Sequence, residues 1–246
     1  MNAIQSKKKV MEIYGFMHIY MVNNWREIVE GQVSKMKVSG LWDKLSSLLV
    51  GYIDNGVNQE TPDFFNEEKV SILYQSKDPT IYESLTLSNL HYISEQKEGV
   101  VFYIHTKGVT HLGNPFQLDW REMMEYFMLE RYELCLEELK HTDIVGTNWH
   151  FGEGYLGARK KFSGGVPITP HFSGNFWWAN TSYIRRLPNL IPIQGRHDCE
   201  FWIGRAFPKV SELWGMKTSP HKTLCPPDLY RGKENIKHIK TRLPNA

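Results

Sequence analysis

Hydrophobic residues in the first 110 positions fall into two alternating patterns. Continuous apolar runs rich in β-branched and aromatic residues predict strands, whereas apolar residues at every third or fourth position predict amphipathic helices. The predicted strands span 13–22, 45–54, 69–75 and 99–105, and the predicted helices span 25–39 and 83–95. Strands that alternate with helices indicate right-handed crossovers and therefore a largely parallel sheet.

The pattern is less regular after residue 110. The predicted elements are a helix from Asp119 to Leu139 that begins with a capping box of Asp119 and Glu122, a strand over 143–150, a strand running into a helix over 171–187, and a short helix over 198–207. The sequence therefore predicts a single α/β domain over residues 1–246, with a mostly parallel central sheet flanked by helices and an irregular C-terminal part.

A glycine-rich stretch interrupts this second half. Residues 151–170 contain five glycines and two prolines, with the basic residues 159–161 at the centre. Loops of this length in compact domains are often binding loops. We therefore expect this loop to fold over a binding site.

The stretch HFSGNFWWA, residues 171–179, places Trp177 beside Trp178. Adjacent residues on a strand point to opposite faces of the sheet, so both rings cannot enter one core. We expect one ring to close a core against the helix from Asp119 and the other to face a cleft, where an aromatic face can pack against a sugar.

Composition limits the classes of function. The net charge of +2 gives no general case for nucleic-acid binding. Three cysteines without CxxC spacing are consistent with reduced thiols, which predicts a cytoplasmic protein and leaves open a peripheral position at a membrane. No run approaches 18 uninterrupted apolar residues, so no transmembrane segment is expected.

Polar residues follow each predicted strand, at the sheet edge where ligands of α/β proteins gather. They are Asn23, Asp54, Ser76, Asp78 and the run His105, Thr106, Lys107 and Gly108. A lysine beside a glycine can approach a phosphate, because the glycine lets the backbone come close. A solvated lysine in a turn is the alternative. GxxxxGK[ST] does not occur, and the one GxGxxG match, residues 152–157, lies in the predicted long loop rather than at the start of a predicted helix, so a P-loop or an ordinary dinucleotide site is not supported.

Three motifs in order, FYIHTKGVT, HFSGNFWWA and RHDCEFWIG, resemble a group of polysaccharide-building glycosyltransferases of bacteria and large viruses. The wider layout is similar to nucleotide-sugar transferases of the GT-A fold. The resemblance implies an enzyme that moves a sugar from a nucleoside diphosphate sugar to a glycan acceptor. It also implies a nucleotide-sugar half over about 10–110, an acceptor and catalytic half over about 111–215, and a tail over 216–246.

The resemblance also implies roles for residues. The donor-binding set is Asn23, Asp54, Ser76, Asp78, His105, Thr106, Lys107 and Gly108, and the acceptor-binding set is His171, Ser173, Gly174, Asn175, Trp177 and Trp178. Glu200, or else Asp198, would be the general base of an inverting displacement, or would stabilise an oxocarbenium-like centre in a retaining one. The alternative for these two carboxylates is a capped helix with a surface ion pair.

The motif that GT-A enzymes usually carry for a divalent metal, Asp-x-Asp, occurs nowhere in the chain. His105-Thr106-Lys107 stands at its expected position. Two explanations remain: Lys107 replaces the metal as a cation beside the diphosphate, or His105 and a distant carboxylate still hold manganese or magnesium.

Two other classes of function compete with the transferase. A non-catalytic glycan-binding module would keep only the aromatic platform. A nucleotidyltransferase would need a glycine-rich basic loop after the first strand, and the sequence lacks one.

Overall fold

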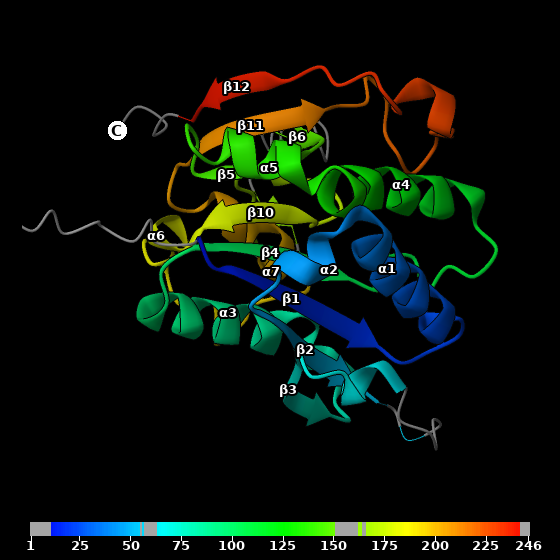
Figure 1. Ribbon diagram of the computed structural model, residues 1–246, viewed down its shortest axis with the longest axis vertical. Helices are drawn as coiled ribbons and strands as arrows, with labels where there is room; N and C mark the ends of the chain where they lie inside the picture. The colour runs from blue at the N-terminus through cyan, green and yellow to red at the C-terminus, as the bar shows by residue number, and fades with distance from the viewer. Residues whose placement is uncertain (1–10, 55, 57–62, 151–161, 164–165, 242–246) are drawn as a thin grey trace, which may run out of the picture.

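The computed structural model describes residues 11–54, 56, 63–150, 162–163 and 166–241. Within them the chain forms an α/β protein around an eight-stranded, mostly parallel sheet with the order β12-β11-β5-β10-β4-β1-β2-β3 (Figure 1). The strands of this sheet are β1 (Ile13–Tyr20), β2 (Ser47–Ile53), β3 (Val70–Ser76), β4 (Val100–His105), β5 (Ile144–Thr147), β10 (Trp177–Asn180), β11 (Lys209–Trp214) and β12 (Lys237–Lys240).

Helices cover both faces of the sheet. They are α1 (Trp25–Ser39), α2 (Leu41–Lys44), α3 (Ser84–Gln96), α4 (Pro115–Glu125), α5 (Tyr132–Glu138), α6 (Thr181–Ile184) and α7 (Asp198–Phe201), with a π-helical turn η3 (Tyr126–Glu130) and short 3-10 turns η1 (Asp63–Asn66), η2 (Pro79–Ile81), η4 (Trp202–Gly204) and η5 (Pro227–Leu229). Two small antiparallel pairs join β6 (Trp149–His150) to β9 (His171–Phe172) and β7 (Phe162–Ser163) to β8 (Val166–Pro167). The strands predicted in the first 110 residues are confirmed to within about two residues.

Strand direction decides where the functional residues meet. Strands β1 to β4 are mutually parallel, and β11 is parallel to β5. Strand β10 lies between β4 and β5 and runs antiparallel to both. The start of β10 therefore lies at the same edge of the sheet as the ends of β1, β2 and β4.

Each of the adjacent tryptophans of β10 enters a separate core. Trp177 packs with Tyr103 on the face covered by α3 and α6, and Trp178 packs with Phe102 on the face covered by α1, α4 and α5. Both rings are 0% exposed. The expectation that one ring faces a cleft is therefore wrong, because β10 is an internal strand with a helical layer on each side.

The expectation of one continuous helix from Asp119 is also wrong. Helix α4 begins at Pro115, and the Asn114 side chain caps it by accepting hydrogen bonds from the backbone at 116 and 117. A proline at the first helical position needs no hydrogen-bond acceptor for its nitrogen, which favours this start. Asp119 instead accepts a hydrogen bond from the Cys225 backbone N–H at 3.0 Å.

The π-helical turn η3 interrupts the predicted helix and provides the hydrogen-bond acceptor for the Trp178 indole N–H. A π-turn shifts the backbone hydrogen bonds by one residue, as in the bond from Arg131 N–H to the Tyr126 carbonyl. The Trp178 indole N–H donates to the Met128 carbonyl at 2.9 Å. A carbonyl of the turn thus satisfies a buried donor of β10.

The C-terminal part is more regular than expected, since β11 and β12 extend the sheet. The hydrophobic pattern did not predict strand β11, because the buried residues of this strand include the polar residues Ser211 and Glu212. Glu212 accepts a hydrogen bond from the Trp149 N–H and one from Lys237 of β12. Polar residues that are paired in this way can occupy a buried strand.

Candidate active site

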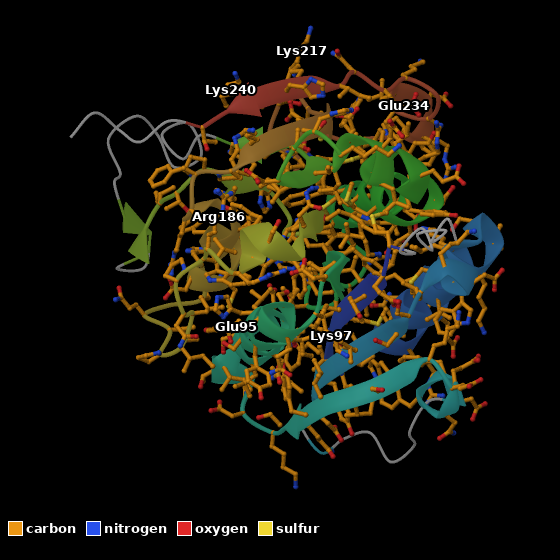
Figure 2. All side chains as sticks on the ribbon, turned by 60° about the vertical axis from the view of Figure 1, so that its left-hand side comes forward. Glu95, Lys97, Arg186, Lys217, Glu234 and Lys240 are labelled. Atoms are coloured by element: carbon orange, nitrogen blue, oxygen red, sulfur yellow. The ribbon has the colours of Figure 1, made fainter. Side chains whose placement is uncertain are left out.

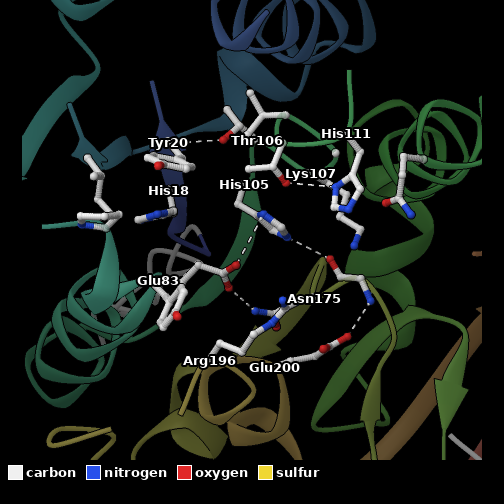
Figure 3. A pocket seen from close by; sticks show the side chains of 18 of the residues that line it. His18, Tyr20, Glu83, His105, Thr106, Lys107, His111, Asn175, Arg196 and Glu200 are labelled. Carbon is white, nitrogen blue, oxygen red and sulfur yellow. Dashed lines mark hydrogen bonds and ion pairs between the residues drawn. The ribbon is translucent and has the colours of Figure 1, made fainter. Parts of the chain in front are cut away.

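A cavity of about 410 Å³ lies at the sheet edge where β1, β2 and β4 end (Figure 3). Its walls come from β1, β4, the start of α3, the turn before β10, and α7. The lining residues are His18, Tyr20, Ile53, Pro79, Thr80, Tyr82, Glu83, His105, Thr106, Lys107, Gly108, Val109, Thr110, His111, Gln117, Gly174, Asn175, Arg196, His197 and Glu200. Cationic, carboxylate and aromatic side chains therefore share one space.

The segment after β4 is held from behind by a buried carboxylate. Gln32 donates to the His105 carbonyl at 3.1 Å and to Glu125 at 2.9 Å. Arg121 donates to the Lys107 carbonyl at 3.0 Å, and its Nε lies 3.5 Å from Glu125. Because Glu125 fixes both donors, the backbone that presents Lys107 to the cavity has a defined position.

Lys107 extends its ammonium group over an aromatic ring. Its Nζ lies 4.0 Å from the centre of the Trp120 ring, which is a cation–π contact. Burial lowers the pKa of Lys107, and Arg196 lowers it further, whereas Glu200 and Glu83 oppose the shift. The cavity thus combines a partly desolvated lysine with an arginine.

Glu200 faces this cation from α7. Its Oε1 accepts a hydrogen bond from the Gly174 N–H at 3.1 Å, and His171 Nε2 lies 4.0 Å from the same oxygen. Burial alone would raise the pKa of Glu200, but His171, Lys107, the Gly174 N–H and His197 together lower it. The carboxylate is therefore ionised at neutral pH and able to accept a proton.

The turn before β10 has an unusual backbone. Gly174 has φ of 92° and Asn175 has φ of 58°, both in the left-handed region. A Cβ on residue 174 would lie 2.5 Å from Met124 Sδ and 3.0 Å from the Trp120 ring, so only glycine fits. The Asn175 side chain is already bound, since it donates to Glu83 and accepts from the Trp177 indole N–H.

His18 lies at the end of β1 on the cavity wall. Its Nδ1 is 3.0 Å from Thr86 Oγ1 and 3.1 Å from the Tyr74 hydroxyl. Burial lowers its pKa to about 4, against a smaller opposing effect of Glu83. His18 is therefore neutral at physiological pH and offers its other ring nitrogen for hydrogen bonding.

The structure brings some of the expected residues together and leaves others outside. Of the expected sets, His105, Thr106, Lys107, Gly108, Gly174, Asn175 and Glu200 line the cavity, whereas Asn23, Asp54, Ser76, Asp78, His171, Ser173, Trp177, Trp178 and Asp198 do not. The basic loop 159–161 lies outside the described residues.

Several of the residues outside the cavity have identifiable partners. Asp198 is buried, forms an ion pair with Arg205 and accepts a hydrogen bond from the Gln194 N–H. The alternative expected an ion pair, but at the surface, and the helix α7 has no side-chain cap. Asp78 accepts from the Thr80 N–H at the start of η2. These interactions assign both carboxylates to local structure.

Sequence reasoning missed part of the lining. The residues that it did not select include His18, Tyr82, Glu83, His111 and Arg196. Glu83 carried one usable signal, since it opens the helix that follows the third strand at the ligand-binding edge. The others come from segments whose position depends on the three-dimensional fold.

A metal site was left open by the sequence. Among the residues that the structure describes, no group of three or more His, Cys, Asp or Glu side chains is arranged to hold a metal ion. The pair closest to the second explanation is Glu83 and His105, whose Oε1 and Nδ1 lie 3.6 Å apart.

The comparisons with known proteins give a distant likeness. No protein-family model and no curated protein matches the sequence. Among solved structures, residues 1–349 of TarS from S. aureus are similar over 77% of this chain, with 14% sequence identity and a TM-score of 0.36. This chain spans 55% of the length of that one.

In the described part of the chain, no helix combines the length and the apolar character needed to cross a bilayer.

Proposed function

We propose that the chain is a glycosyltransferase that moves a sugar from a nucleoside diphosphate sugar to a glycan acceptor, in polysaccharide or glycoprotein-glycan synthesis. The observation that carries the proposal is the pairing of Lys107 with an ionised Glu200 in one cavity. Sugar transfer needs a positive charge beside the leaving diphosphate and a group that deprotonates the acceptor. Two of the three motifs that resemble glycosyltransferases contribute these residues, Lys107 from FYIHTKGVT and Glu200 from RHDCEFWIG.

The roles follow from charge. Lys107 and Arg196 lie where the diphosphate would bind and offset its negative charge. The acceptor hydroxyl oxygen attacks the anomeric carbon while Glu200 takes the hydroxyl proton. The bond from that carbon to the diphosphate oxygen breaks, and the diphosphate leaves with the electron pair. Lys107 stabilises the charge that grows on the leaving oxygen.

A divalent ion would supply the same neutralisation of the diphosphate. Glu83 and His105 are the residues that would hold it, as a pair of one oxygen and one nitrogen donor. In the proposal Lys107 and Arg196, two cationic side chains of the same cavity, provide this charge.

The proposal divides one domain into two functional halves. The ends of β1 and β4 and the start of α3 would hold the donor, and the turn before β10 with α7 would hold the acceptor. One continuous sheet with strands from both halves supports this arrangement. The glycan-binding alternative is weaker, because the Trp177 and Trp178 rings on which it depended are buried.

A donor screen tests the proposal. Purified protein is mixed with a panel of nucleoside diphosphate sugars, with and without manganese, and both thermal stabilisation and release of the nucleoside diphosphate are measured. One donor is expected to stabilise the fold and to be consumed in the presence of acceptor glycan. Glycan binding without any nucleotide binding would contradict the proposal.

A further inference from the structure

We propose that Glu83 is a positioning residue of this site, which holds the turn Gly174–Asn175 and through it fixes the Glu200 carboxylate. The inference extends the proposed function, since it concerns the geometry of the residue assigned as general base. Glu83 belongs to no motif of the sequence. It lines the cavity from the start of α3, across from Glu200 (Figure 3).

The first contact is a direct hydrogen bond across the cavity. Asn175 Nδ2 donates to Glu83 Oε2 at 2.7 Å, a short distance typical of a charged acceptor. The same amide accepts the Trp177 indole N–H through its oxygen at 2.9 Å. Glu83 therefore sets the orientation of the Asn175 amide, and the amide in turn satisfies a fully buried indole.

The second contact passes through His105. Its Nε2 donates to the Gly174 carbonyl at 3.0 Å, and its Nδ1 lies 3.6 Å from Glu83 Oε1. A histidine whose Nε2 donates to a carbonyl has its orientation defined by that bond. Glu83 thus binds the side chain of Asn175 directly and lies beside the histidine that binds the carbonyl of Gly174.

The opposite side of the same turn is held by Glu200. The Gly174 N–H donates to Glu200 Oε1 at 3.1 Å, so one two-residue turn lies between two carboxylates. Because Asn175 has a left-handed backbone angle, which is uncommon for a residue other than glycine, surrounding contacts help to maintain the shape of the turn. A shift of the turn would move the N–H that orients Glu200.

The local structure around Glu83 favours its contact with Asn175. Glu83 occupies the N-cap position of α3, yet its side chain makes no capping hydrogen bond to its own helix. The residues that usually cap a helix from that position are Ser, Thr, Asp and Asn, whose side chains are shorter than that of glutamate. Tyr82, directly before it, has φ of 46°, a strained value for a bulky residue that also lines the cavity. The strain and the unused cap both accompany the reach of Glu83 toward Asn175.

The test compares Glu83→Ala and Glu83→Gln with the wild type. The control is Glu95→Gln, at the exposed end of the same helix (Figure 2). We measure kcat, the Kd of the free nucleoside diphosphate by calorimetry, and hydrogen exchange of the Trp177 indole N–H by NMR. The exchange measurement needs no activity and therefore tests the positioning separately from the proposed function.

In Glu83→Ala, kcat is expected to fall about 100-fold, the scale of an effect of small misplacement in an active site, while the Kd changes less than about threefold. Exchange of the Trp177 indole should become about tenfold faster, because Asn175 loses its charged partner. Glu83→Gln keeps an acceptor oxygen for Asn175 and should lose about tenfold in kcat. Glu95→Gln should match the wild type in all three.

Two results would overturn the inference: wild-type kcat together with wild-type indole exchange in Glu83→Ala, or a loss of nucleoside diphosphate affinity as large as the loss of kcat. The second would make Glu83 a binding residue. If the wild type transfers no sugar but the Trp177 indole still exchanges faster in Glu83→Ala than in the wild type, only the proposed function is contradicted.

Discussion

The ammonium nitrogen of Lys107 lies 4.0 Å from the centre of the Trp120 ring. The ring holds the cation by its face, and Arg121 holds the lysine backbone from behind through the carbonyl. A lysine fixed in this way loses little conformational entropy when an anion binds. Under the proposed function, Lys107 is therefore already in position for a phosphate group before the ligand binds.

Replacing Lys107 by methionine should weaken binding of the free nucleoside diphosphate about 10- to 100-fold, because a charge-assisted hydrogen bond is lost. Calorimetry at neutral pH measures the change. Lys217→Met, at an exposed position (Figure 2), is the matched control and should bind as the wild type does. An unchanged Kd in Lys107→Met would remove Lys107 from the donor site.

Glu200→Gln should lower kcat for sugar transfer by about 100- to 10,000-fold, the usual contribution of general base catalysis. The amide oxygen can still accept the Gly174 N–H, so the fold and the Kd for the nucleoside diphosphate should change little. Turnover is measured by release of the nucleoside diphosphate, with Glu30→Gln on the exposed face of α1 as control. Wild-type turnover in Glu200→Gln would exclude it as the base.

The affinity for the nucleoside diphosphate should depend on pH through Lys107. Burial and Arg196 hold the pKa of Lys107 below its ordinary value of 10.5, so its positive charge is lost as the pH rises through that lowered pKa. The Kd should therefore begin to rise at a pH below 10.5, the ordinary pKa of a lysine. Glu200 opposes the shift, so in Glu200→Gln the rise should occur at lower pH still. Calorimetry from about pH 7 to pH 10 covers this range, and identical profiles for the two proteins would refute the coupling.

Trp178→Phe should lower the free energy of unfolding by about 2 to 4 kcal/mol. The Met128 carbonyl loses its buried donor, at a cost of about 1 to 3 kcal/mol, and the smaller ring leaves a cavity. Denaturant unfolding measures the difference. Trp42→Phe, at a half-buried position on α2, should cost less than about 1 kcal/mol. Equal losses in both variants would show that the bond to Met128 contributes nothing.

The rule that ligands gather at strand ends selected cavity residues after one strand only, because Asn23, Asp54, Ser76 and Asp78 lie outside the cavity. A continuous apolar run ending in His105 identified the central strand, and the polar residues after it do line the cavity. Gly174, Asn175 and Glu200 were selected by motif resemblance rather than by any physical pattern. Their meeting with His105 requires β10 to run antiparallel, which residue periodicity does not specify.

Other features of the sequence were misleading for physical reasons. Asn175 is a polar residue of a type that often binds ligands, but its amide already forms hydrogen bonds with Glu83 and Trp177. The two tryptophans seemed too many for one core because periodicity cannot reveal a second core on the opposite face. Strand β11 was not predicted because it contains the charged residue Glu212. The partners that stabilise this charge, Trp149 and Lys237, are distant in sequence.

The reversed strand β10 also constrains the order of assembly during synthesis. It is the only bridge, among the described strands, between the β4-β1-β2-β3 and β5-β11-β12 groups. Until residues 177–180 have been made, β4 remains an open edge with its backbone groups unpaired on one side. Open apolar edges attract other chains, so a stalled or truncated product ending before β10 is expected to aggregate.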